Sequence, residues 1–164
     1  MTARPVVDQE QAAWIQSGVV TIVLSSHGPS LMPSLAIGVG CRPAEQGSAL
    51  RVFVLEAKAA QLLSDVRGGA AISVLFLQAT THRAIQLKAS RAREVARTAA
   101  DLATTDAYVD SMVVELAPLG ESEAYVRATF ARGHDSLVVL EITPAEAFDQ
   151  TPGPTAGARL GGPQ

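Results

Sequence analysis

The sequence predicts a mainly β (α+β) fold, a six-stranded antiparallel β-barrel with peripheral helices. Short runs rich in β-branched residues follow one another closely, and only one short helical segment interrupts them before a longer helical insertion. Several runs are apolar on both strand faces. A closed sheet explains this, because one face lines the interior and the other lies under a helix or a second subunit. A doubly wound parallel sheet would need a helix after nearly every strand.

The first part of the chain reads as a short helix followed by three strands. We expect the helix at residues 8–17 and the strands at residues 19–26, 31–41 and 50–55. Gly18 ends the helix, and the turn HGPS connects the first two strands. In the second strand, Pro33 indicates an edge or a bulge, while Gly38 and Gly40 indicate bending or close approach of backbones.

The second part contains a hairpin and the helical insertion. We expect a helix at residues 56–69, strands at 70–77 and 81–96, helices at 98–117 and 121–132, and a final strand at 134–143. Leu62, Leu63 and Val66 recur at helical spacing before a stop at Gly68. The acidic residues of the longest helix read as its solvated face: Asp101, Asp106, Asp110 and Glu115.

The chain of 164 residues is long enough to bury one core without disulfides or metal ions. We predict a single domain over residues 1–150, followed by a Pro- and Gly-rich tail at residues 151–164. Hydrophobic residues make up 48% and charged residues 18%, a composition that argues against disorder. We expect a partner subunit to cover part of the apolar surface.

Charge and cysteine content argue against several classes of protein. The formal net charge is -3, without a long run of one sign, so we expect neither nucleic-acid binding nor a polybasic membrane patch. The chain has one cysteine, Cys41, no apolar run of membrane-spanning length and no secretory signal, which predicts a cytoplasmic protein. The three histidines, at positions 27, 82 and 134, are scattered, and we expect no metal site.

Common catalytic motifs are absent from the sequence. GVGCRP has the first two glycines of a dinucleotide fingerprint, but Pro43 stands at the third position and the segment leaves a strand for a loop. There is no P-loop, nucleophile elbow or HExxH motif. Cys41, at the end of an apolar strand, is interpreted as packing rather than as a nucleophile. The catalytic residues therefore stay unknown.

The strand THRAIQLKAS is the first candidate for a binding site. Alternation places His82, Gln86 and Lys88 on one face, and Arg83 on the other, next to the loop at the barrel rim. There the guanidinium can offer a bidentate fork to a phosphate or a carboxylate. The alternatives are an ordinary ion pair for Arg83 and a solvated or subunit-covered strand face for the other three.

The strand-to-helix junction VLEAKAAQLL is the second candidate. A helix N-terminus presents unpaired backbone N–H groups, and Lys58 lies in its first turn, which is typical of a phosphate site. Glu56 near the cap would repel an anion, so an ordinary surface helix start is the alternative.

Residues 10–157 resemble the pyridoxamine 5'-phosphate oxidase-like family, whose fold is the FMN-binding split barrel. The resemblance is carried, in combination, by SGVVTIVLSS, PSLAIGVGCR, AAQLLSDVRGGAAISVLF, THRAIQLKAS and AFDQTPGPTAG, and is greatest to a short branch of the family. It implies a six-stranded split barrel, a homodimer, and FMN at the subunit interface, with basic residues around the phosphate and strand backbone against the ring.

The resemblance implies these cofactor-binding residues: Ser34, Val54, Leu55, Lys58, Gln61, Thr81, His82, Arg83 and Gln86. Lys58 and Gln61 match the family's phosphate-binding helix start, and Thr81 to Gln86 match the strand beside the ring. The arginine and lysine of true oxidases would fall within LMPSLAIGVG, which has neither, and the tail lacks their substrate-gripping segment. We therefore do not expect oxidation of pyridoxamine 5'-phosphate.

The resulting hypothesis is an FMN-binding protein, an oxidoreductase of flavin reductase type acting on a small-molecule substrate or electron acceptor. FMN itself supplies hydride or electron transfer, which suits a sequence without a catalytic constellation. One alternative is a non-catalytic split barrel that binds haem, through His27 or His82, or another small molecule. The other is a structural dimer without a cofactor.

Overall fold

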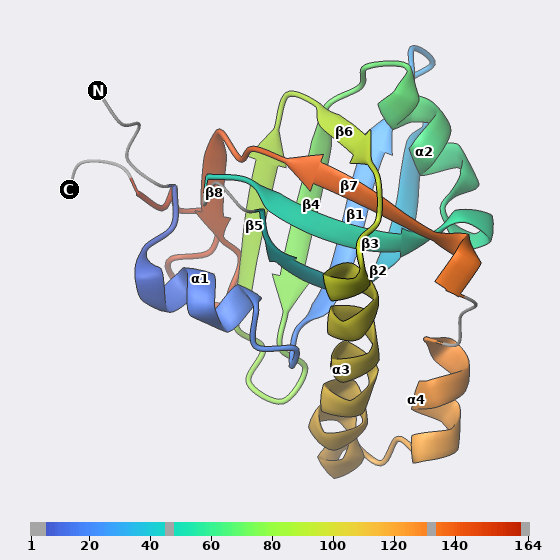
Figure 1. The fold of residues 1–164 in the computed structure, drawn as a ribbon. Coiled ribbons are helices and arrows are strands. Elements are labelled where there is room, and N and C mark those ends of the chain that lie inside the picture. Colours follow the sequence, from blue (N-terminus) through green and yellow to red (C-terminus); the bar gives the residue numbers. More distant parts are fainter. Residues whose placement is uncertain (1–5, 45–47, 131–133, 162–164) are drawn as a thin grey trace.

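The computed structural model describes residues 6–44, 48–130 and 134–161, which form one strongly curled antiparallel sheet with helices around it (Figure 1). The strands are β1 (Thr21–His27), β2 (Pro33–Pro43), β3 (Leu50–Leu55), β4 (Ile72–Leu77), β5 (Ala84–Ala89), β6 (Ala92–Val95), β7 (Leu137–Ile142) and β8 (Glu146–Asp149). The helices are α1 (Gln9–Ile15), α2 (Ala60–Arg67), α3 (Ala99–Leu116) and α4 (Glu123–Thr129).

The sheet order β6-β7-β3-β2-β1-β4-β5-β8 makes the curl necessary. Five strands lie between β6 and β5 in this order, yet only Ser90 and Arg91 separate the two strands in the chain. Consecutive Cα atoms are about 3.8 Å apart, so this connection spans at most roughly 11 Å. The two ends of the sheet must therefore approach each other, which produces a split barrel.

The sheet has eight strands rather than the six predicted. The strand predicted at residues 81–96 is broken at Ser90, because β6 leaves β4 and pairs with β7 instead. Strand β8, which the sequence did not predict, pairs with β5. Beyond it the tail returns along β8, where Phe148 forms a bridge with Arg159.

Strand β2 bends where its two glycines lie. Its register against β3 shifts between Gly38 and Cys41, and Gly40 has a φ of +132°, a conformation that side chains disfavour. A Cβ on Gly38 would lie 2.8 Å from Cβ of Ile22 on β1. The predicted bending and close backbone approach are both confirmed, and they let β2 pair with β1 along one half and with β3 along the other.

The core fills the barrel and the space under α2, α3 and α4. Its largest fully buried side chains include Phe53, Phe76, Ile22, Leu24, Leu62, Leu63 and Met112. Helix α2 lies over one end of the barrel, while α1 and α3 lie at the other (Figure 1). Tyr108 of α3 and Phe130 after α4 meet edge to face at 5.6 Å, which joins α4 to the core.

All predicted helices are present, with shifted ends. The helix expected at 56–69 begins as a 3-10 turn, Glu56–Lys58, and becomes α-helical at Ala60. Reciprocal capping boxes begin two helices, from Asp8 in α1 and from Thr98 in α3. The end of the helix predicted to reach 132 falls outside the described residues. None of the helices described is long and apolar enough to cross a membrane.

The acidic side of α3 is not the solvated face that the sequence predicted. Asp106 and Asp110 are exposed, but Asp101 is 0% exposed and Glu115 is 8% exposed. Glu115 accepts hydrogen bonds from the backbone N–H and the hydroxyl of Thr80 in the β4–β5 turn. The helix places its first and last turns against the barrel, and buried carboxylates are retained there because each has donors.

Asp101 lies between two arginines of the barrel. Nε of Arg42 is 2.6 Å from its Oδ1, and Nη2 of Arg51 is 2.7 Å from its Oδ2. Burial alone would raise the pKa of Asp101, but hydrogen bonds from Arg51, from the Thr98 backbone and from Arg42 lower it to about 2.

Candidate functional site on the outer sheet face

The outward side chains of five adjacent strands form two rows across the sheet, which we call the apolar row and the polar row. The apolar row consists of Ile37, Val23, Leu75, Gln86 and Phe148, each opposite the next on β2, β1, β4, β5 and β8. The polar row is Leu35, Ser25, Ser73, Lys88 and Glu146 on the same strands. All ten are exposed or half-buried, whereas their strand neighbours Ile22, Leu24, Val74, Phe76 and Leu87 are buried.

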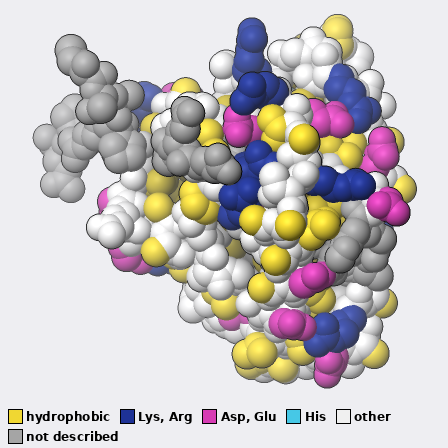
Figure 2. All heavy atoms as spheres, in the orientation of Figure 1, with side chains coloured by type: hydrophobic (Ala, Val, Ile, Leu, Met, Phe, Trp, Pro, Cys, Tyr) yellow, Lys and Arg dark blue, Asp and Glu magenta, His cyan; other side chains and the backbone are white. Residues whose placement is uncertain are grey.

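This face differs from the opposite side of the barrel. Over β6 and β7, charged side chains of both signs are interspersed (Figure 2), including the pairs Arg67–Glu94 and Arg93–Glu141. Such exposed pairs form an ordinary solvated surface. The two rows instead combine exposed apolar groups with a few polar ones, as surfaces that bind a ligand or another protein do.

Polar groups on the face are connected across strands. Nε2 of Gln86 donates to Oγ of Ser73 at 2.7 Å, and Nε2 of Gln150 donates to Oε1 of Gln86 at 3.1 Å. The ammonium of Lys88 lies 4.8 Å from the ring centroid of Phe148. An amide, a hydroxyl and a cation thus stand beside the exposed apolar side chains of the row.

The exposed apolar surface continues into the β1–β2 hairpin. Leu35 is 66% exposed, and Leu31 and Met32 in the hairpin turn are 73% and 71% exposed. Leu31 also has a φ of +59°, a left-handed conformation that costs an ordinary side chain about 1–2 kcal/mol. Nothing in the described chain covers these groups, as expected for a surface that contacts another molecule.

Of the residues predicted in THRAIQLKAS, Gln86 and Lys88 lie on this face. His82 occupies the preceding turn with a φ of +59°, and the Thr81 hydroxyl accepts a hydrogen bond from the backbone N–H of Arg83. The Arg83 guanidinium turns toward α1, donates to both carboxylate oxygens of Glu10 at 2.7 and 3.0 Å, and stacks 4.6 Å from the centroid of Trp14.

This Arg83 pair shifts both pKa values. The hydrogen bond from Arg83 lowers the pKa of Glu10, and the same hydrogen bond raises the pKa of Arg83. The ion pair named above as the alternative for Arg83 is therefore the arrangement in this structure, and a phosphate would have to displace Glu10.

The residues predicted around α2 surround a carboxylate. Ser34 donates to Oδ2 of Asp65 at 2.6 Å, and Nε2 of Gln61 donates to its Oδ1 at 3.0 Å. Asp65 is only 8% exposed. Lys58 extends away and donates to the carbonyl of Thr129 in α4 at 3.0 Å. A phosphate here would meet the negative charge of Asp65. The Ser34 bond instead joins β2 to α2, and the Gln61 bond lies within α2.

Val54 and Leu55 are core residues in the structure. They are 0% and 5% exposed, and β3 is paired on both sides, with β2 and with β7. Their side chains do not line an accessible surface within one chain.

The predicted residues do not converge within one chain. Ser34 lies opposite Ser26 at one end of β1, while Thr21 at the other end lies opposite Leu77, just before the turn that carries Thr81 to Arg83. Five residues of strand separate these ends by about 17 Å. The exposed apolar side chains of the apolar row lie beside Gln86, and Lys88 is the cation nearest to Gln86 in register. A complete phosphate site would need basic groups from a second copy of the chain, or the release of Arg83 from its ion pair with Glu10.

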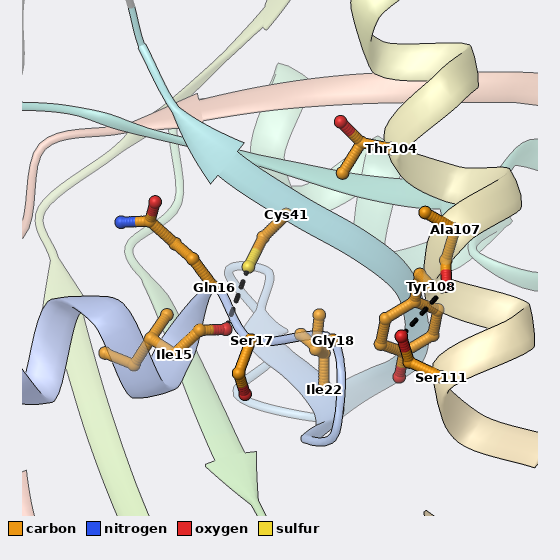
Figure 3. Close-up of a pocket in the computed structure, with 10 residues that line it drawn as sticks. All are labelled: Ile15, Gln16, Ser17, Gly18, Ile22, Cys41, Thr104, Ala107, Tyr108 and Ser111. Carbon is orange, nitrogen blue, oxygen red and sulfur yellow. Dashed lines mark hydrogen bonds between the residues drawn. The ribbon is translucent and has the colours of Figure 1, made fainter. Parts of the chain in front are cut away.

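A pocket of about 100 Å³ lies elsewhere, between the end of α1, the α1–β1 turn and α3 (Figure 3). Its lining residues are uncharged and include Ile15, Cys41, Tyr108 and Ser111. The Cys41 thiol donates to the Ile15 carbonyl, and burial raises the pKa of Cys41 to about 12. Cys41 is therefore inert packing, as expected. The pocket is far below the roughly 300 Å³ of a ligand site for a molecule of flavin size.

Sequence reasoning missed Ser73, Phe148 and Gln150 as members of the face. Alternation in AAISVLFL would have placed Ser73 on the outer face, opposite Lys88. Phe148 and Gln150 gave no such signal, because they follow or belong to the strand that was not predicted. Among the described residues, no group of three His, Cys, Asp or Glu side chains could hold a metal ion.

Comparison with known proteins supports the fold. No family model matches the chain, and no curated protein does. The fold is similar to that of a "putative pyridoxamine 5'-phosphate oxidase" from Lactobacillus delbrueckii (11% identity, TM-score 0.53, 90% of this chain and 97% of that chain covered). It is also similar to HupZ of Group A Streptococcus (10%, 0.53, 92% and 100%) and to a conserved hypothetical protein of Mycobacterium tuberculosis (15%, 0.52, 91% and 88%). At these identities the chain shares the split-barrel fold with them.

Proposed function

We propose that this protein binds FMN on its outer sheet face as a homodimer and acts as an oxidoreductase of flavin reductase type. The observation that carries the proposal is the apolar row, which contains Gln86 between Leu75 and Phe148 and has Lys88 beside it. A flavin has a flat, largely apolar ring with one polar edge and a phosphate, so an apolar strip bordered by an amide and a cation is complementary to it. The fold shared with an oxidase-like structure supports the same assignment.

A second copy is part of this proposal. One exposed sheet face covers only one side of a ring, whereas small-molecule sites usually bury most of the ligand surface. Exposed apolar residues supply the contact that a partner would cover: Leu35 and Ile37 at the β2 end of the rows, and Leu31 and Met32 in the adjoining hairpin turn. Two copies meeting there would enclose the cofactor and bring two sets of polar groups to it.

When bound, FMN would supply the hydride or electron transfer, and the chain's own groups would orient the ring and exclude water. Oxidation of pyridoxamine 5'-phosphate is not part of the proposal. The second strand has no basic residue where true oxidases carry two, and its one hydroxyl, Ser34, is bound to Asp65.

The test is an absorption spectrum of the purified protein followed by titration with FMN, read by flavin fluorescence. We expect a flavin spectrum or saturable binding at micromolar or lower concentration. An intense Soret band would instead establish haem binding. The absence of both cofactors would leave a barrel that binds another small molecule, or a structural dimer without a cofactor.

A further inference from the structure

The chain Gln150–Gln86–Ser73 holds one amide in a defined place on the face. Its three members come from different segments: Gln150 follows β8, Gln86 is on β5 and Ser73 is on β4. The backbone N–H of Gln150 also donates to the carbonyl of Ala84 at 2.8 Å, so the outer member is itself anchored to β5. A glutamine side chain has several rotatable bonds, and two hydrogen bonds to anchored partners restrict them.

The Gln86 amide keeps hydrogen-bonding capacity for a ligand. A primary amide has two N–H donors and two acceptor lone pairs, and each of the two hydrogen bonds described uses one of these. One donor and one acceptor remain. They stand in the apolar row, where Leu75 and Phe148 lie opposite Gln86 on its two sides. A ligand that binds over this row covers the Gln86 amide. A ligand that hydrogen-bonds with the remaining donor and acceptor is therefore favoured over one that leaves them buried without partners.

We propose that Gln86 recognises an adjacent N–H and C=O pair, the lactam or imide edge of a planar ring, and that Ser73 and Gln150 are positioning residues for it. This inference rests on the proposed function, since the pyrimidine part of a flavin presents such an edge. It adds the determinants of ligand choice: the apolar row accepts the ring, and the held amide selects rings with this edge over rings without it.

The experiment compares FMN with N3-methyl-FMN, which lacks the N–H of that edge. Dissociation constants for both are measured with wild-type protein and with Gln86→Leu, Gln150→Leu and Ser73→Ala. We expect the wild type to prefer FMN at least tenfold, and each variant to reduce that preference below about threefold. The control is Ser111→Ala, the same serine-to-alanine change on α3 and outside both rows, where the hydroxyl donates to the Ala107 carbonyl; it should keep the wild-type preference.

The outcomes separate the two proposals. If wild-type protein does not bind FMN, the proposed function fails. If it binds FMN and N3-methyl-FMN equally, or if Gln150→Leu and Ser73→Ala keep the full preference while remaining folded, FMN binding stands and the role of the Gln150–Gln86–Ser73 chain is overturned. Thermal unfolding of each variant establishes that it is folded.

Discussion

Asp101 stabilises the first turn of helix α3 and its contact with the barrel. Its carboxylate receives Arg42, Arg51 and the backbone N–H of Thr98, so it both caps the helix and neutralises two cations. Removing one member of a buried ionic group leaves the others without compensation, which typically costs 3–5 kcal/mol.

We therefore predict that Asp101→Asn lowers the free energy of unfolding by about 3 kcal/mol. Urea denaturation measures this, with Asp110→Asn as the control. Asp110 is an exposed acid on the same helix that pairs with Arg127, and its loss should cost less than about 1 kcal/mol. Similar losses in both variants would contradict the assigned role of Asp101.

The pKa of Asp101 also predicts a dependence of stability on pH. Because the folded-state pKa is about 2 and the ordinary value is 3.8, the unfolded chain binds the proton more readily. The contribution is complete above about pH 5 and is lost as pH falls through 4 toward 2, a total of about 2 kcal/mol. Denaturation curves at pH 6 and pH 3 should show this loss in the wild type and a smaller one in Asp101→Asn.

Arg83 supplies a test of the phosphate assignment carried over from the resemblance. If Arg83 and Lys58 hold the FMN phosphate, changing either to Ala should weaken FMN binding by about 1.5–3 kcal/mol. Glu10 competes for Arg83 in the structure, so Glu10→Gln should strengthen binding. Fluorescence titration distinguishes the cases: unchanged affinity in Lys58→Ala and Arg83→Ala would mean that these cations serve only to hold α4 and α1.

At the scale of elements, the bend of β2 decides whether the barrel forms. Gly38 lets β2 cross Ile22 without a side chain between the backbones, and Gly40 takes up the bulge. We predict that Gly38→Ala destabilises the protein by about 1–3 kcal/mol, the usual cost of overpacking, because its Cβ would lie 2.8 Å from two Ile22 carbons. Thermal unfolding measures this; an unchanged midpoint would mean that β1 and β2 can move apart freely.

Side chains of the β4–β5 turn hold helix α1 against the end of the barrel. Nε1 of Trp14 donates to Oε1 of Gln78 at 3.0 Å, and the Gln78 Nε2 lies 3.4 Å from Glu115 of α3. Together with Arg83 and Glu10, these contacts connect α1, the turn and α3. The turn that carries three of the predicted cofactor residues is thus a structural junction.

At the scale of the whole molecule, the outer sheet face exposes apolar side chains of the kind that a second copy of the chain would cover. We predict that the protein is a dimer in solution and that Ile37→Asp shifts it toward the monomer, because the charge would be buried among Val23, Leu35 and the partner. Sedimentation velocity measures the species present. The control Val114→Asp changes an apolar residue that is 74% exposed on α3, away from the face, and should leave the dimer intact.

The predicted dimer is connected with the cofactor site. If Ile37→Asp yields a folded monomer that binds FMN as tightly as the wild type, the second copy does not contribute to the site. A parallel loss of dimer and FMN affinity would agree with a shared site.

The sequence by itself determined the order of the main strands and helices, the alternation of inward and outward side chains along β5, and the need for glycine in β2. These properties follow from local periodicity and backbone conformation, which neighbouring residues specify. It also placed Gln86 on the outer face, because alternation continues along a strand whatever the strand pairs with.

Only the tertiary structure decided the partners of the charged groups and the closure of the sheet. Asp101 and Asp110 look alike on a helix, yet Asp101 is buried between two barrel arginines and Asp110 is exposed and pairs with Arg127 of α4. Arg83 meets Glu10, 73 positions earlier in the chain, and β6 turns to β7 rather than continuing along β4. These contacts join distant parts of the chain, and no local pattern encodes which distant residue a side chain will reach.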